Sequence, residues 1–111
     1  MSCLRWRVAI NSSRYGFALD EEVEAADADE LVLRLRELAA ETTRRGEAKS
    51  VPSFFREAAA QIVESTAPLA FCRYVAQEWN HEHADVPMPV EFAAAADFVA
   101  AAQSVGLLRP C

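Results

Sequence analysis

The spacing of apolar residues changes once along this chain of 111 residues, and that change constrains the fold more than any other feature. Residues 4–10 alternate between apolar and polar or small side chains, which is typical of a half-buried β-strand. From residue 27 onward, apolar residues recur every three or four positions, which is typical of amphipathic helices. We therefore predict an α+β fold in a single domain of residues 1–111, with the sheet formed by the N-terminal part.

A β-hairpin is predicted at the N-terminal end. Turn-forming residues, including Gly16, follow the first strand, and alternation resumes at residues 17–19. Residues 22–25 are the candidate for a third strand. Glu and Ala are poor strand formers, so this strand stays an open alternative. The prediction is a short antiparallel hairpin, with a third strand as the open question.

About four helices are expected after the hairpin. Either Asp27 or Asp29 suits the N-terminal cap of the first helix, and Gly46 suits its end. Ala67 and Pro68 predict a break between the second and third helices, with one long kinked helix as the alternative. The last helix is expected to begin after Pro89. The core stripe predicted for the second helix consists of Phe54, Phe55, Ala58, Ala59 and Ile62.

The last predicted helix has very little polar surface. Seven alanines lie among residues 93–102, and only four residues of the segment 90–108 are polar. A helix that is apolar all round is buried, either inside its own bundle or against another subunit. We therefore expect this helix to be central in the domain or to form a symmetric homodimer. The candidate partner-binding residues on it are Phe92, Ala95, Ala96 and Val99.

An acidic segment, residues 20–30, contains seven carboxylates and no basic residue. A helix N-terminus accounts for the acids at 27, 29 and 30, because negative charge there opposes the positive end of the helix dipole. The remaining acids are candidates for docking a basic protein partner. They are Asp20, Glu21, Glu22 and Glu24.

The charge distribution disfavours a nucleic-acid partner. The formal net charge is −6, and the ten arginines are dispersed along a chain with one lysine, as expected from a GC-rich bacterial or phage genome. The alternative function is that of a DNA-associated transcriptional regulator or an antitoxin-like protein. Arg5 and Arg7 flank Trp6, and helices joined across Asn80–Pro89 could form a helix-turn-helix, although that connection is long for the motif.

Catalytic and metal-binding motifs are weak in this sequence. The metal candidates are His81, His83 and Glu78. His81 and His83 are two positions apart, so on a helix their side chains point about 200° away from each other and do not converge on one ion. No phosphate-binding loop or nucleophile elbow is present. We expect no cofactor, and a metal-dependent enzyme is the least favoured alternative.

Cellular location is inferred from cysteines and hydropathy. Three cysteines with no CxxC pair argue against a disulfide framework, and no apolar run approaches the roughly 18 residues of a membrane span. The terminal region also lacks the apolar stretch of a signal peptide. We therefore expect a small cytoplasmic protein-protein interaction module, acting as an adaptor, inhibitor or regulator, that self-associates through alanine-rich helices and has no membrane contact.

Overall fold

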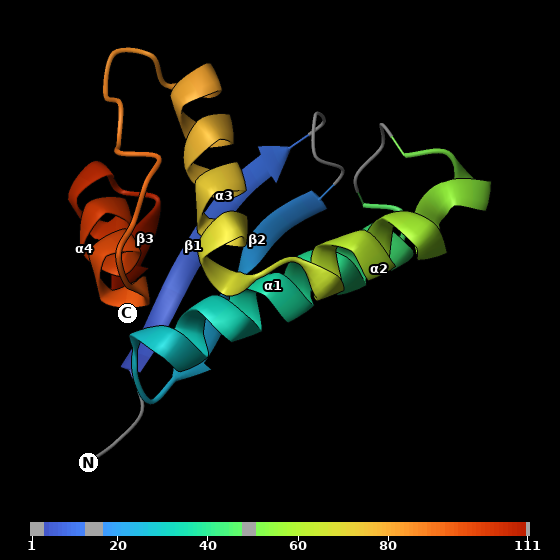
Figure 1. Ribbon diagram of the computed structural model, residues 1–111, viewed down its shortest axis with the longest axis horizontal. Coiled ribbons are helices and arrows are strands. Elements are labelled where there is room, and N and C mark those ends of the chain that lie inside the picture. Colours follow the sequence, from blue (N-terminus) through green and yellow to red (C-terminus); the bar gives the residue numbers. More distant parts are fainter. Residues whose placement is uncertain (1–3, 13–16, 48–50, 111) are drawn as a thin grey trace.

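The computed structural model describes residues 4–12, 17–47 and 51–110. These residues form an α+β structure with a three-stranded antiparallel sheet and four α-helices (Figure 1). In chain order, the elements are β1 (Leu4–Ser12), β2 (Phe17–Ala25), α1 (Ala28–Arg44), the short 3-10 helix η1 (Ser53–Phe55), α2 (Arg56–Ser65), α3 (Pro68–Glu82), α4 (Ala95–Val105) and β3 (Leu108–Pro110).

The sheet has the strand order β2-β1-β3. β1 and β2 pair from Leu4 opposite Ala25 to Ser12 opposite Phe17, which confirms the predicted hairpin. Residues 22–25 continue β2 and do not form a strand of their own. The third strand comes instead from the C-terminal region, where three residues of β3 pair with β1. A strand of three residues is too short to show periodicity in the sequence, so β3 was not predicted. The turn predicted around Gly16 lies outside the described residues.

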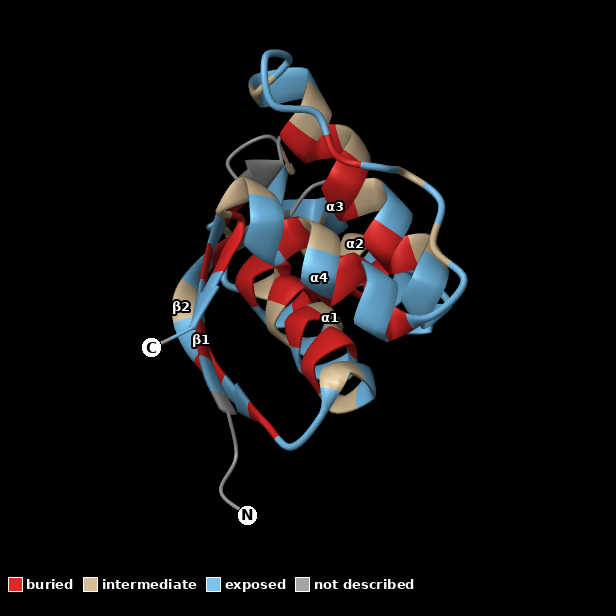
Figure 2. Ribbon diagram, turned by 90° about the vertical axis from the view of Figure 1, so that its left-hand side faces the viewer, coloured by how far each residue is buried: buried red, intermediate tan, exposed pale blue. Residues whose placement is uncertain are grey.

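The helices cover one face of the sheet and leave the other face in solvent (Figure 2). The covered face contributes Trp6, Val8 and Leu19 to the core, so the predicted alternation is confirmed. The opposite face presents charged side chains, among them Arg5 and Arg7. The protein therefore consists of two layers, a sheet and a helical layer, with the core between them.

Helix α1 occupies the centre of the helical layer and contacts β2, α2, α3 and α4. Of the two aspartates predicted as candidates for its N-terminal cap, Asp27 takes this role: its Oδ1 accepts a hydrogen bond of 2.8 Å from the Glu30 amide. The Glu30 carboxylate accepts a hydrogen bond from the Ala26 amide in return. Gly46, in the left-handed conformation with a φ of 78°, follows the C-terminus as expected.

Helix α2 packs with a face that the sequence pattern did not predict. The break before Pro68 is confirmed, because α2 ends at Ser65 and α3 begins at Pro68. The residues that α2 buries are Ala60 and Val63, whereas Ile62 is 66% exposed. The predicted core stripe is therefore wrong for this helix, and its large apolar side chains face solvent.

Helix α4 begins at Ala95 and not directly after Pro89, so Phe92, which was expected on this helix, lies before it. The Ala94 amide donates a hydrogen bond to Asp97 Oδ2, which starts the helix there. Before that point, Asn80 on α3 holds the chain in place through two hydrogen bonds to the backbone of Met88. Its Nδ2 donates to the Met88 carbonyl (2.8 Å), and its Oδ1 accepts from the Met88 amide (2.7 Å). Gly106 ends the helix as predicted, with a φ of 87°.

No helix among residues 4–12, 17–47 and 51–110 combines the length and apolar character needed to cross a membrane. Within α3, Cys72 is fully buried, and this burial raises the pKa of its thiol to about 12. A thiol with such a pKa carries almost no thiolate at neutral pH. Cys72 is therefore a small core residue and not a reactive nucleophile.

Candidate interaction surfaces

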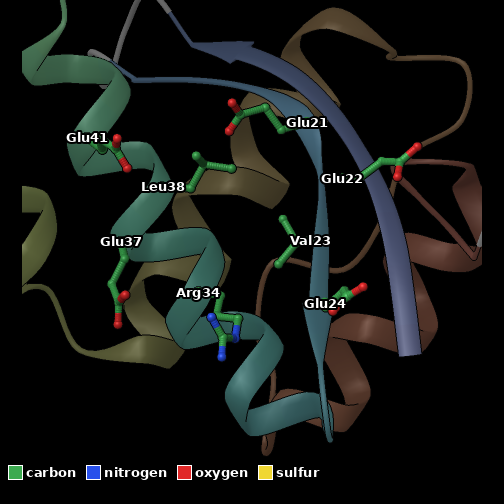
Figure 3. A pocket seen from close by; sticks show the side chains of 8 residues that line it. All are labelled: Glu21, Glu22, Val23, Glu24, Arg34, Glu37, Leu38 and Glu41. Atoms are coloured by element: carbon green, nitrogen blue, oxygen red, sulfur yellow. The ribbon is translucent and has the colours of Figure 1, made fainter. Parts of the chain in front are cut away.

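A groove of about 340 Å³ lies between β2 and α1 (Figure 3). Val23 points from β2 toward α1, and Leu38 points from α1 toward β2, so these two side chains form an apolar floor. The remaining lining residues are charged. They are Glu21, Glu22 and Glu24 from β2 and Arg34, Glu37 and Glu41 from α1.

The charge of this groove is only partly neutralised by nearby arginines. Glu24 pairs with Arg5 at 2.5 Å, and Arg45 lies 3.1 Å from Glu41 and 4.0 Å from Glu21. The lining itself holds five acidic residues and one arginine, Arg34. Arg34 and Arg45 also pair with Glu30 and Glu47, which lie outside the groove. For Glu22 and Glu37, no ion pair is present among the described residues, so the groove retains free carboxylates.

The acidic candidates thus divide between the two faces of the sheet. Asp20, Glu22 and Glu24 are exposed on the solvent face, where Asp20 pairs with Arg7. Glu21 lies on the helix-facing side between Leu19 and Val23 and is half-buried. Three of the four predicted residues line the groove, whereas Asp20 does not.

A second candidate surface is the apolar face of η1 and α2. Phe54, Phe55 and Ile62 are 80%, 54% and 66% exposed. The rings of Phe54 and Phe55 lie against one another, with centroids 4.8 Å apart. An aromatic side chain covers about 150–250 Å², so the two rings leave roughly 250 Å² of apolar surface in water. The sequence pattern predicted Phe54, Phe55 and Ile62 in the core and therefore gave no sign that they form an exposed surface.

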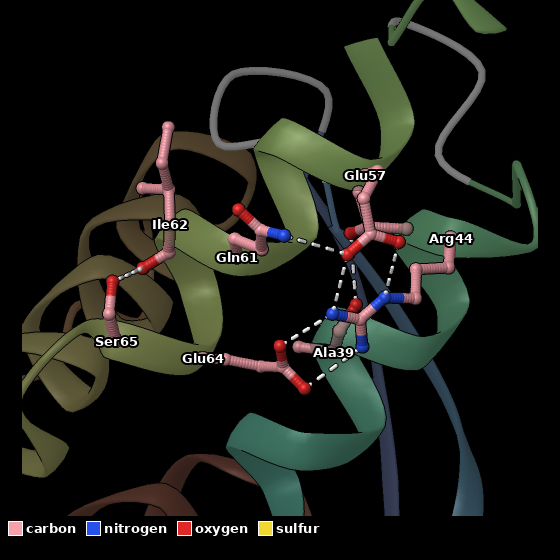
Figure 4. A network of polar contacts seen from close by, with 8 residues as sticks. Ala39, Arg44, Glu57, Gln61, Ile62, Glu64 and Ser65 are labelled. Atoms are coloured by element: carbon pink, nitrogen blue, oxygen red, sulfur yellow. Dashed lines mark hydrogen bonds and ion pairs between the residues drawn. The ribbon is translucent and has the colours of Figure 1, made fainter. Parts of the chain in front are cut away.

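A cluster of exposed ion pairs joins α2 to α1 (Figure 4). Arg44 donates hydrogen bonds of 3.0 Å to both carboxylate oxygens of Glu57 and also contacts both oxygens of Glu64, at 2.9 and 2.5 Å. These bonds hold the pKa of each carboxyl below its ordinary value, and the hydrogen bond to Glu64 contributes most to a raised Arg44 pKa. One arginine thereby holds two turns of α2.

The partner-binding residues predicted around α4 are largely part of the core. Ala95 and Val99 are buried, and Phe92 is half-buried with its ring edge-on to Phe98 at 5.4 Å. Ala96 alone of the four predicted residues is exposed, and Ala100 extends this small exposed face by one turn. Helix α4 is thus half-covered and is not the central helix of the domain, because α1 takes that position.

The metal candidates have different surroundings. Glu78 is buried, His81 is exposed, and His83 stacks on Trp79 with ring centroids 3.8 Å apart. His83 Nδ1 also lies 3.3 Å from the Trp79 carbonyl oxygen. Within the described parts of the chain, no three His, Cys, Asp or Glu side chains are grouped so that they could hold a metal ion.

The arginines proposed for nucleic-acid contact are engaged within the sheet. Arg5 pairs with Glu24 and Arg7 pairs with Asp20, so acidic side chains lie beside both guanidinium groups. Residues 83–94 connect α3 to α4, which is longer than the three or four residues of a helix-turn-helix turn. Arg14, the third arginine of this region, lies outside the described residues.

Comparison of the chain with protein-family models, with curated proteins and with solved structures gives no match. The functional argument therefore rests on the groove between β2 and α1 and on the apolar face of η1 and α2.

Proposed function

We propose that this chain is a small protein-protein interaction module, an adaptor, inhibitor or regulator, that binds a basic segment of a partner protein in the groove between β2 and α1. The observation that carries the proposal is one groove with an apolar floor whose lining includes five acidic residues, two of which, Glu22 and Glu24, direct their carboxylates to the adjoining solvent face of the sheet. Carboxylates attract and orient a cationic partner, and apolar contacts contribute affinity that salt does not screen. A cytoplasmic location agrees with this function but stays an expectation.

The proposal is tested with a defined basic peptide. The probe is acetyl-Arg-Val-Arg-Val-Arg-Val-Arg-amide, and its binding to the full chain is measured by isothermal titration calorimetry. The matched peptide with Glu in place of Arg should not bind. Chemical-shift changes in amide NMR spectra should fall on residues 21–24 and 34–41.

A charge variant of the protein localises the contact. Glu22→Gln combined with Glu37→Gln removes the two groove carboxylates without an ion pair, and we expect about fivefold weaker binding, from roughly 0.5 kcal/mol for each exposed charge. Glu82→Gln combined with Asp85→Asn removes the same charge from the end of α3 and should leave binding unchanged. Absence of binding, or an equal loss in both double variants, would reject the proposed function.

Self-association is a second candidate function, supported by the exposed apolar side chains of η1 and α2. A two-fold axis would place the same face of a second copy against Phe54 and Ile62. Arg44 pairs with both neighbouring acids, Glu57 and Glu64, and its single positive charge lowers the like-charge repulsion between two copies. Phe54→Ser combined with Ile62→Ser should convert the protein to a monomer in sedimentation equilibrium. A wild-type monomer at 0.1 mM would exclude this candidate.

A further inference from the structure

Among the described residues, no strand pairs with the outer side of β2, so this side is an open sheet edge. β2 is the first strand in the order β2-β1-β3, and all nine of its residues pair with β1 on one side only. In an antiparallel pair, every second residue directs its amide and carbonyl away from the neighbouring strand. Four or five residues of β2 therefore point backbone hydrogen-bonding groups away from β1.

The groove lies along this open edge. In Figure 3, β1 runs on one side of β2, and α1 with the groove lies on the other side. A further strand would add at about 4.8 Å from β2. Its side chains would alternate between the solvent face of the sheet and the apolar floor at Val23 and Leu38. An extended backbone is the conformation that pairs with an open strand edge along its length.

Charge determines which chain can occupy the edge. A second copy pairing through β2 would bring Asp20, Glu22 and Glu24 opposite acidic side chains of the same strand, and like charges directly opposite one another are destabilising. A segment with Arg or Lys at alternate positions reverses this interaction on the solvent face. Glu21, Glu37 and Glu41 extend the same preference to the other face, around the apolar floor.

We propose that β2 binds its partner by strand addition: an extended segment of another protein, with basic residues at every second position and an aliphatic side chain between them, becomes the fourth strand of the sheet. The aliphatic side chain contacts Val23 and Leu38, and the basic side chains contact the carboxylates of the solvent face. This inference rests on the proposed function, because it specifies how the basic partner is bound in the same groove.

Backbone methylation of the peptide separates strand addition from simple charge attraction. In an extended Arg-Val peptide, the valine amides point to one edge and the internal arginine amides to the other. One peptide carries N-methyl groups on its three valines, and a second carries them on the arginines at positions 3, 5 and 7. Both keep every side chain and charge of the parent peptide, and the wild-type protein is used throughout.

Strand addition predicts an asymmetric result. Loss of three hydrogen bonds, each of ordinary net strength, should weaken one methylated peptide about a hundredfold, while the other binds within about threefold of the parent. Amide hydrogen exchange should slow at alternate residues of β2 when the parent peptide is bound. Equal affinity of the two methylated peptides would overturn strand addition while leaving the proposed function intact. If the parent peptide does not bind, the proposed function itself fails.

Discussion

The guanidinium group of Arg56 occupies the space that a side chain at Gly46 would need. An ideal Cβ placed on Gly46 lies 2.5 Å from Arg56 Cζ, and the Gly46 backbone has a φ of 78°. Two requirements therefore meet at one residue after α1: a left-handed conformation and room for the arginine of α2. This position links the end of α1 to the start of α2 in a way that only glycine satisfies without strain.

Gly46→Ala should lower the free energy of unfolding by about 1–2 kcal/mol, the usual cost of a left-handed conformation with a Cβ. Urea denaturation measures this change. Gly106→Ala is the matched control, because Gly106 has a φ of 87° but its nearest Arg109 atom lies 3.8 Å from the ideal Cβ. Both variants should lose stability, but only Gly46→Ala should shift the Arg56 Nε resonance in NMR spectra. A stable Gly46→Ala with an unmoved Arg56 would contradict this packing.

Truncation of two adjacent residues of α2, Ile62 and Val63, should lower stability to very different extents. Val63→Ala removes buried methyl groups and should cost about 2 kcal/mol in the free energy of unfolding. Ile62→Ala removes more carbon but from a side chain that is 66% exposed, so its effect should stay within about 0.5 kcal/mol. Chemical denaturation of the two variants gives the order. If Ile62→Ala were the more damaging change, α2 would have the face predicted from the sequence pattern in the core.

The ion pairs of Arg44 predict a specific acid dependence of stability. The hydrogen bonds from Arg44 lower the pKa of Glu57 and Glu64 below the ordinary value of 4.5 in the folded state. A depressed carboxyl pKa stabilises the protein above the unfolded-state pKa, and this contribution is lost as the pH falls through the folded-state pKa. Glu57→Gln combined with Glu64→Gln should therefore be less stable than wild type at pH 7.

The difference between the two proteins should shrink below pH 4.5 and vanish in stronger acid. Thermal unfolding followed by circular dichroism from pH 7 to pH 2 measures it. Glu82→Gln combined with Asp85→Asn serves as the control, because neither residue contacts Arg44. A stability difference that is constant with pH would show that the Arg44 pairs do not contribute through ionisation.

Asn80→Ala should release the chain between α3 and α4. The amide of Asn80 makes two hydrogen bonds to the backbone of Met88, and each is worth about 1 kcal/mol. We expect a loss of about 1–2 kcal/mol in unfolding free energy and faster hydrogen exchange at the amides of Val86 and Met88. His81→Ala, on an exposed neighbour in the same helix, should change neither quantity. Unaltered exchange in Asn80→Ala would mean that Trp79 alone holds this segment through its hydrogen bond to Val86.

The residues that β2 contributes to the candidate groove could be predicted from the sequence, whereas those from α1 could not. Glu21, Glu22 and Glu24 belong to one acidic run that is visible in the sequence. Arg34, Glu37, Leu38 and Glu41 come from α1, and in the sequence they fit an ordinary helix with a solvated face. They join β2 because α1 folds back over the sheet, and the pattern of a single element does not specify this arrangement.

The same distinction applies to the apolar helices. The alanine content of α4 predicted that this helix would be buried in the centre of the domain or against a second subunit. The central helix is α1, because it contacts the sheet and the other three helices. For α2, the hydrophobic stripe predicted one buried face, but Arg44 anchors the helix through Glu57 and Glu64 with that stripe outward. Which face a helix buries depends on what its neighbours offer as well as on its own periodicity.

Local sequence patterns were sufficient to predict the hairpin strands, an aspartate cap at the start of α1, the break at Pro68 and the glycine stops at Gly46 and Gly106. These features arise from steric and hydrogen-bonding preferences that act within a few residues. The tertiary structure alone decided the C-terminal third strand, the outward face of α2 and the groove between β2 and α1. Each of these depends on contacts between residues far apart in the chain, where many local patterns are compatible and packing of the whole core selects one.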